Sequence, residues 1–142
     1  MQNLLEVDHQ DIPSFPYSDV THVRVVDVYD ADTVTVLFIH GGNILKYKMR
    51  ILNIDSPEIR SKNTLLREHA IAGREYVKSI VDDQTLYRVS LVKWDKYGGR
   101  IIGELFIENA KLSSILIENG YCAPYDGHTK LSDDDMVEYL GL

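Results

Sequence analysis

Residues 21–54 read THVRVVDVYDADTVTVLFIHGGNILKYKMRILNI, and this stretch decides the fold. In three runs, β-branched and other apolar residues alternate with polar ones. The three runs are Val23–Val28, Thr33–Ile39 and Leu45–Arg50. Such alternation is typical of strands that bury one face, because successive side chains point to opposite sides of a strand. Turn-forming residues separate the runs, so the stretch predicts three consecutive strands joined by two turns.

The rest of the chain predicts two more strands and about three helices. Apolar residues recur at three- and four-residue steps over residues 64–81, which indicates an amphipathic helix. Residues 85–93 and 100–107 have strand patterns around a glycine turn, and a short helix is predicted at residues 112–119. A final helix is predicted after Ser132, a good N-cap. This order does not fit βαβ units, so the predicted fold class is α+β, mainly β, with a five-stranded antiparallel OB-fold barrel.

The length of 142 residues suits one domain with one hydrophobic core. We expect an acidic N-terminal extension at residues 1–20 and a single OB-fold domain at residues 21–142. The only cysteine, Cys122, excludes an internal disulfide and any zinc or iron–sulfur site built from several thiolates. The sequence shows no basic, apolar leader and no apolar run long enough for a bilayer, so we expect a soluble, cytoplasmic protein.

The charge is unevenly distributed along the chain. The net charge of −7 alone argues against nucleic acid as a partner. Residues 1–20 and residues 126–142 each carry a net charge of −4, whereas residues 44–100 contain twelve Lys and Arg against seven Asp and Glu. Lys46, Lys48 and Arg50 alternate along one predicted strand and therefore share a face. The middle of the chain can still face a polyanion, although ordinary segregation of surface charge is an equal alternative.

Carboxylates and arginines gather at three predicted turns. Asp30 and Asp32 stand together at a strand end, where paired aspartates can ligate a hard cation. A solvated Asx turn is the commoner role of two such aspartates. Arg50 is followed by Asp55 and Glu58, which flank a proline and so lie in a rigid turn. A second arginine follows the last glycine turn.

Together, three segments resemble the signature segments of the staphylococcal nuclease (thermonuclease) family. The segments are Val28–Val34, Met49–Glu58 and Asp95–Arg100. They occur in the family's order and at compatible spacing, and the resemblance extends from about Val23 to Tyr125. It implies an OB-fold, Ca²⁺-dependent phosphodiesterase that cleaves DNA and RNA at the 5′-oxygen and leaves 3′-phosphate ends.

The resemblance also implies a role for individual residues. The implied calcium ligands are Asp32, Asp55 and the backbone carbonyl of Ser56, with Asp30 behind them. The implied catalytic residues are Arg50 and Arg100, which would grip the phosphate, and Glu58, which would deprotonate or orient the attacking water. The implied substrate-binding residues are Lys96 and Tyr97, at a neighbouring phosphate, and Tyr125, against a base.

Physical chemistry agrees with these roles. A phosphodiester attacked by water gains charge on its non-bridging oxygens, which a divalent cation and two guanidiniums stabilise. Arginine suits this task because its planar fork matches two phosphate oxygens. A carboxylate such as Glu58 can hold the water either as a general base or as an orienting acceptor.

The chain departs from the family pattern at four places. Ser56 stands where threonine is more usual. A residue that binds the ion through its backbone carbonyl tolerates the loss of a side-chain methyl group. The extra glycine in Gly98-Gly99 leaves the register of Arg100 open by one residue. Tyr125 lies in a loose part of the match, where packing is as good an alternative as contact with a base. A short acidic segment replaces a long basic C-terminal helix, which predicts weak affinity for long nucleic acid.

Two function classes follow from these observations. We expect a nuclease that acts as a monomer, takes DNA and RNA with single strands favoured, and has no membrane partner. The alternative is a non-catalytic OB-fold module that binds nucleic acid or protein, since OB barrels serve both purposes. Asp32, Asp55 and Glu58 favour the enzyme, because their charge would repel a phosphate that was only to be bound.

Overall fold

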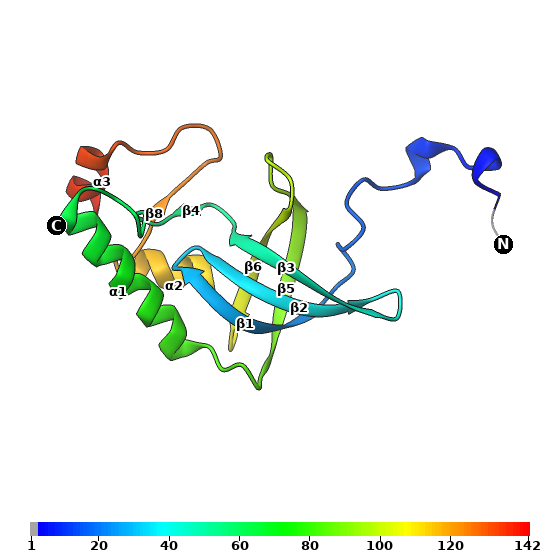
Figure 1. Cartoon of the computed structure of the whole chain (residues 1–142), viewed down its shortest axis with the longest axis horizontal. Helices are drawn as coiled ribbons and strands as arrows, with labels where there is room; N and C mark the ends of the chain where they lie inside the picture. Colours follow the sequence, from blue (N-terminus) through cyan, green and yellow to red (C-terminus); the bar gives the residue numbers. More distant parts are fainter. Residues whose placement is uncertain (1–2) are drawn as a thin grey trace.

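Five strands close into a barrel in the computed structural model, which describes residues 3–142 (Figure 1). The strands are β1 (His22–Asp30), β2 (Thr33–His40), β3 (Asn43–Ile51), β5 (Leu86–Trp94) and β6 (Arg100–Ile107). Their order is β3-β2-β1-β5-β6, and β3 also pairs with β6 to close the ring. The predicted fold class is confirmed.

One pair in the barrel is parallel, which the prediction of an antiparallel barrel did not include. Strand β3 pairs with β6 in parallel, with Lys48 opposite Arg100 and Arg50 opposite Ile102, whereas β1–β2, β1–β5, β2–β3 and β5–β6 are antiparallel. The reason is geometric: five strands in a closed ring cannot alternate in direction all the way round, so one neighbouring pair runs the same way.

Three two-residue strands and two 3-10 helices lie outside the predicted elements. The short strands are β4 (Ile54–Asp55), β7 (Ala110–Lys111) and β8 (Ala123–Pro124), and the 3-10 helices are η1 (Leu4–Glu6) and η2 (His9–Asp11). Strands β4 and β8 pair antiparallel in a small second sheet. Two or three residues are too few to show a hydrophobic period, so sequence patterns could not reveal these elements.

The three predicted helices are present and lie near one end of the barrel (Figure 1). They are α1 (Thr64–Ile80), α2 (Leu112–Glu118) and α3 (Asp133–Leu140). Asn63 caps α1, its side chain accepting the Leu66 N–H at 3.2 Å. Ser132 caps α3 in the same way by accepting the Asp135 N–H at 3.2 Å, as predicted.

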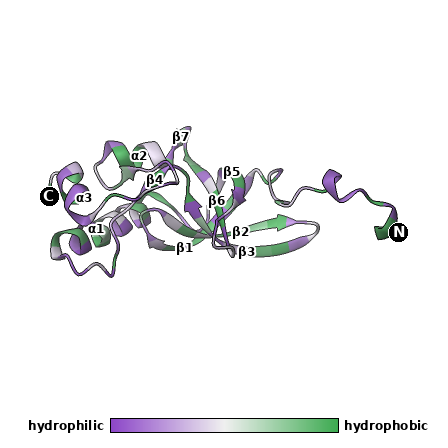
Figure 2. Ribbon diagram, turned by 90° about the horizontal axis from the view of Figure 1, so that it is seen from above, coloured by the Kyte–Doolittle hydropathy of each residue, from purple (hydrophilic) through white to green (hydrophobic). Residues whose placement is uncertain are grey.

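Helix α1 is amphipathic and packs against the barrel (Figure 2). Leu66, Ala70, Gly73 and Val77 form its buried face. A Cβ added to Gly73 would lie 3.1 Å from the Cβ of Ala31, so the glycine lets the helix approach the turn between β1 and β2 closely. This contact with α1 holds the turn between β1 and β2 in place.

The barrel interior is filled by inward-facing residues of all five strands. Val34, Val36, Met49, Ile51, Ile101 and Leu105 are among its completely buried side chains. Burial of such side chains stabilises the fold by roughly 1.5–3 kcal/mol each. Polar residues of the same strands alternate outward, so the barrel offers a polar outer face on which a site can be built.

Residues 14–20 lie along the barrel, whereas residues 3–13 extend away from it (Figures 1 and 2). Phe15 contacts Trp94 edge to face, with 5.3 Å between the ring centres. Tyr17 contacts Phe38 in the same way, with 5.1 Å between the ring centres. The indole N–H of Trp94 also donates to the Ser14 carbonyl at 3.1 Å. The division into residues 1–20 and 21–142 stays a prediction.

No helix within residues 3–142 is long and apolar enough to cross a membrane.

Helix α2 receives its cap from a neighbouring strand. Glu104 on β6 is buried, and its carboxylate accepts the Ser113 N–H at 3.3 Å, the Leu105 N–H at 3.2 Å and the Ser113 hydroxyl. We expect Glu104→Ala to lower the free energy of unfolding by about 2 kcal/mol, because one buried and one half-buried N–H group lose their acceptor. Urea denaturation measures this loss. The exposed Glu118→Ala is the control, and equal small changes in both variants would contradict the capping role.

Candidate functional site at one end of the barrel

Two aspartates are buried in the turn between β1 and β2. The Asp30 side chain accepts the Asp32 backbone N–H at 3.1 Å. The Asp32 carboxylate accepts the Thr33 hydroxyl at 2.9 Å through one oxygen and the Ser56 N–H at 3.0 Å through the other. Asp30 therefore orders the turn, and Asp32 ties the turn to the segment after β4.

A sharp reversal after β3 brings a third carboxylate to the same place. Asn53 has a positive φ of 65°, and its carbonyl accepts the Tyr125 N–H at 2.9 Å. The chain then returns through β4, which ends at the buried Asp55. Asp55 thus lies near Asp32, although the two are far apart in sequence.

The guanidinium of Arg50 lies between these carboxylates. Its Nη2 is 3.1 Å from Asp55 Oδ1 and 3.5 Å from Asp32 Oδ2, and its Nη1 donates to the Ile54 carbonyl at 3.3 Å. The ring of Tyr125 lies 5.3 Å from the guanidinium carbon, close enough for a cation–π contact. Arg50 is therefore fixed in one orientation by contacts on several sides.

A cleft of about 520 Å³ opens above Arg50. Its lining residues are Arg50, Lys93, Trp94, Asp95, Lys96, Tyr97, Arg100, Ile102, Tyr125, Gly127 and Lys130. Both arginines of the sequence analysis thus face one cleft, together with the predicted substrate-binding residues. This is the feature that makes the region a candidate site.

Arg100 is held by a buried carboxylate of its own hairpin. Its Nε donates to Asp95 Oδ2 at 2.8 Å, and its Nη2 lies 2.5 Å from the same oxygen. Gly98 and Gly99 have positive φ values of 74° and 76°, which only glycine adopts readily. The two glycines close the turn so that Arg100 opens β6 opposite Lys48. In this chain Arg100, and neither neighbouring residue, lines the cleft.

Glu58 lies at the mouth of the site and is exposed. Its side chain is 70% accessible, and Lys130 Nζ lies 3.9 Å from its Oε1. The same Nζ lies 3.6 Å from Asp55 Oδ1. Lys130 therefore bridges an exposed and a buried carboxylate from the loop that precedes α3.

The environment separates the protonation states of the two turn aspartates. Burial, hydrogen bonding to the Asp32 side chain and the charges of Asp32 and Glu58 together raise the pKa of Asp30 to about 8, although the Asp32 backbone N–H acts in the opposite direction. Burial also favours a higher pKa for Asp32, but hydrogen bonding with Asp30, the Arg50 charge and the Ser56 N–H together lower it. Asp30 is thus the proton-bearing member of the pair at neutral pH, and Asp32 is the ionised one.

Asp55 is also hard to ionise. Burial raises the pKa of its carboxyl, the charge of Asp32 acts in the same direction, and Lys130 and Arg50 oppose both. The cations within the site therefore do not fully offset the burial of the Asp55 carboxylate. A further positive charge at this point would favour ionisation of all of them.

Asp32, Asp55 and Ser56 are the residues that could hold a metal ion. The two carboxylates approach the same Arg50 nitrogen, so they already surround one positive charge. The Ser56 hydroxyl oxygen is buried and has no hydrogen-bond partner within residues 3–142. The same residues contain no cluster of three or more acidic, histidine or cysteine side chains with metal-site geometry. A hard cation would need oxygens from the backbone and from water to complete its shell.

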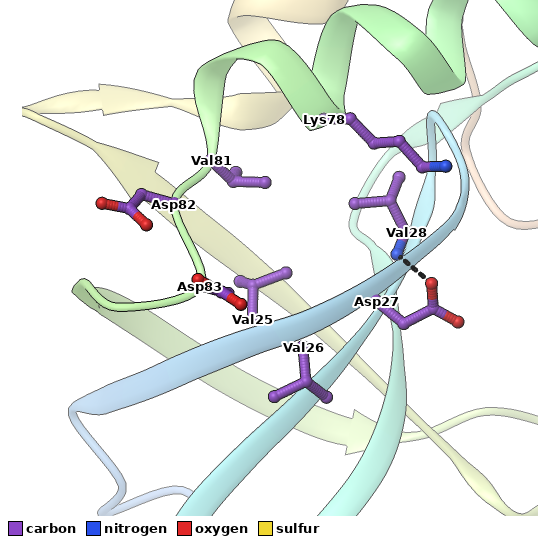
Figure 3. A pocket seen from close by; sticks show the side chains of 8 residues that line it. All are labelled: Val25, Val26, Asp27, Val28, Lys78, Val81, Asp82 and Asp83. Atoms are coloured by element: carbon purple, nitrogen blue, oxygen red, sulfur yellow. Dashed lines mark hydrogen bonds between the residues drawn. The ribbon is translucent and has the colours of Figure 1, made fainter.

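A second hollow, of about 410 Å³, lies between β1 and the end of α1 (Figure 3). Its carboxylates serve the local backbone: Asp27 accepts the Val28 N–H at 2.9 Å, and Asp82 accepts the Gln84 N–H at 3.0 Å. Lys78 and four valines make up most of the remaining lining. These interactions explain the acidic side chains without a ligand.

The predicted site residues lie in one region, in two layers. The lower layer is buried and consists of Asp30, Asp32, Asp55 and Ser56. The upper layer faces the cleft or its mouth and consists of Arg50, Glu58, Lys96, Tyr97, Arg100 and Tyr125. Sequence patterns missed Asp95, although it opens the hairpin segment that ends in Arg100. They also missed Lys130, which is the single cation of an acidic stretch and gave no signal.

Comparison with known proteins supports the sequence resemblance. The family model described as "Staphylococcal nuclease homologue" matches residues 48–140, about two thirds of the chain. The match begins within β3, so Arg50, Asp55 and Arg100 lie inside it, whereas Asp30 and Asp32 precede it. A search of curated proteins gave no significant match.

The raised pKa of Asp30 predicts how the metal-free protein responds to pH. A carboxyl whose folded pKa lies above its ordinary value contributes stability that is fully present below about pH 4 and is lost as the pH rises through about 8. In EDTA, we expect the stability of the wild type to fall over this range, by at most ~1.4 kcal/mol per pH unit from this group.

Asp30→Asn should remove this part of the fall. We expect its thermal midpoint to equal that of the wild type near pH 4 and to exceed it near pH 9. Asp27→Asn is the matched control, since Asp27 is an exposed β1 aspartate. Parallel pH curves for the wild type and Asp30→Asn would contradict the assignment.

Proposed function

The chain belongs to the staphylococcal nuclease homologue family, and from this premise we propose that it is a calcium-dependent nuclease. The proposed reaction is hydrolysis of phosphodiester bonds in DNA and RNA at the 5′-oxygen, which leaves 3′-phosphate ends. The observation that carries the proposal is the cleft in which Arg50 and Arg100 stand over buried carboxylates.

The two arginines suit the transition state of this reaction. Charge grows on the non-bridging oxygens when water attacks phosphorus, and a guanidinium stabilises that charge through two parallel hydrogen bonds. Asp55 holds Arg50 and Asp95 holds Arg100, so little reorganisation is needed when the phosphate arrives. Preorganised donors of this kind lower the barrier rather than only improve binding.

Glu58 is the proposed acceptor for the attacking water. Its carboxylate is exposed at the mouth of the cleft, so water reaches it. The neighbouring Lys130 Nζ, 3.9 Å from Oε1, places an opposite charge beside this carboxylate. A free carboxylate oxygen at this place can accept the proton that the water loses.

The residues of the lower layer fit a hard cation. Asp32 and Asp55 supply anionic oxygens, and the Ser56 segment lies against Asp32 through a hydrogen bond. When bound there, calcium would supply positive charge beside the reacting phosphate. Calcium accepts an irregular shell of oxygens that waters complete, whereas magnesium demands near-ideal octahedral geometry, and on this ground Ca²⁺ is the proposed ion.

The remaining cleft residues suit a flexible strand. Tyr97 is 79% exposed, and Lys96 lies 5.2 Å from its ring, so an aromatic face and a cation are offered together. Tyr125, against Arg50, offers a second ring. Aromatic rings stack on unpaired bases, which supports single-stranded DNA or RNA as the favoured substrate.

Metal dependence is the first test of this function. We expect cleavage of a single-stranded oligonucleotide with Ca²⁺, much slower cleavage with Mg²⁺ and none with EDTA. Asp32→Asn should need more Ca²⁺ for half-maximal activity, because it removes an anionic ligand, whereas Asp27→Asn should not. Undiminished cleavage in EDTA would contradict the calcium assignment, and oligonucleotide binding without cleavage in Ca²⁺ would favour the non-catalytic module.

The role of Arg100 is tested by a conservative change. Arg100→Lys keeps the charge and loses the fork, so we expect kcat to fall about a hundredfold, on the order of 3 kcal/mol, with little change in KM. Arg88→Lys is the matched control, because Arg88 stacks on Phe106, outside the cleft lining. Steady-state kinetics on a short oligonucleotide measures both. A loss confined to KM would make Arg100 an ordinary phosphate contact.

A further inference from the structure

Three cations follow one another on the outer face of β3. Lys46, Lys48 and Arg50 alternate with Tyr47 and Met49, whose side chains turn inward. Alternate residues on a strand are ~6.8 Å apart, a spacing similar to that of successive phosphates in an extended single strand. Lys46 and Lys48 are exposed. Within residues 3–142, neither lysine nitrogen has a carboxylate oxygen within 4.0 Å, so neither lysine forms an ion pair.

A hollow of about 810 Å³ accompanies the two lysines. Its lining residues are Val26, Asp27, Thr35, Lys46, Tyr47, Lys48 and Gly99. Tyr29, which is 45% exposed, lies beside it with Lys48 Nζ 5.3 Å from the ring centre. The hollow thus offers cations, a hydroxyl and an adjacent aromatic ring.

Strand pairing places this hollow next to the cleft. Lys48 lies opposite Thr35 on one side and opposite Arg100 on the other, and Arg50 is the next outward residue of β3. Gly99, which lines the hollow, precedes Arg100, which lines the cleft. A strand whose reacting phosphate lies between Arg50 and Arg100 can therefore continue along β3 over Lys48 and Lys46.

We propose that Lys46, Lys48 and the hollow beside them form an extended binding site for the sugar–phosphate backbone of single-stranded nucleic acid beyond the reacting phosphate. This inference rests on the proposed nuclease function, because it takes the cleft as the start of the path. It gives the acidic chain a local means of holding a polyanion, since the favourable charge is concentrated where the substrate lies.

One acidic residue opposes this site. Asp27 on β1 lies opposite Thr35 and lines the same hollow. Its charge repels a phosphate backbone and limits how far the strand spreads across the sheet towards β1. Removing this charge should therefore strengthen binding, which is the opposite of what loss of a structural contact would do.

Substrate length separates this site from the cleft. The variants Lys46→Gln, Lys48→Gln and the double variant are compared on a dinucleotide and on an octanucleotide of thymidine. We expect KM for the octanucleotide to rise about fivefold per lysine, with kcat unchanged, and no effect on the dinucleotide, which does not reach beyond the cleft. Asp27→Asn should lower KM for the octanucleotide alone.

Binding without catalysis provides an independent measurement. In EDTA, fluorescence anisotropy with a labelled octanucleotide should show weaker binding for each lysine variant. The slope of the logarithm of the binding constant against the logarithm of the salt concentration should fall in magnitude by about 0.7 per lysine. Lys111→Gln is the control: Lys111 is exposed and pairs with Phe106, ~20 Å along β6 from Arg100.

The outcomes distinguish the two proposals. If the wild type cleaves both substrates and the lysine variants match Lys111→Gln at both lengths, the extended site is wrong and the nuclease function stands. If the wild type cleaves neither substrate but the lysine variants weaken octanucleotide binding in EDTA, the nuclease function is wrong and the binding surface stands. Equal losses on both lengths would overturn the extended site, because the lysines would then act within the cleft.

Discussion

Burial of like charges beneath one guanidinium is the constraint on which the site depends. Asp30, Asp32 and Asp55 are each buried, and Arg50 Nη2 touches the last two. Such an arrangement is unfavourable in isolation, because carboxylates lose hydration and repel one another. The fold tolerates it since backbone N–H groups, the Thr33 hydroxyl and a retained proton on Asp30 offset part of the charge.

The barrel and α1 supply the rigidity that this arrangement needs. The turn that carries Asp30 and Asp32 is supported by the contact between Gly73 and Ala31, and Asp55 is held by the pairing of β4 with β8. Parallel pairing of β3 with β6 then places Arg100 next to the strand that carries Arg50. In the proposed nuclease these preorganised charges would serve catalysis at a cost in stability of the free protein, a trade commonly found at functional sites.

The sequence patterns predicted the long strands and helices, because these elements depend on residues that are close together in the chain. Alternation over residues 21–54 and the three- and four-residue steps of α1 predicted the long elements, because each pattern reports one buried face. The candidate residues were identified by resemblance to a family, and the structure places them around one cleft and the buried layer beneath it. The presence of one parallel pair could have been deduced from the odd number of strands, but not that β3 and β6 form it. The pairing of β4 with β8 and the contacts of Lys130 join residues far apart in sequence, so no local hydrophobic period could predict them.

The central claim is that the cleft breaks phosphodiester bonds rather than only holding them. Mass spectrometry of a short single-stranded oligonucleotide after incubation with the protein and Ca²⁺ tests this claim directly, because it identifies both new ends. We expect fragments that carry a 3′-phosphate and a 5′-hydroxyl, and none when Ca²⁺ is chelated. An oligonucleotide that is bound and recovered intact, or fragments with a 5′-phosphate, would contradict the claim.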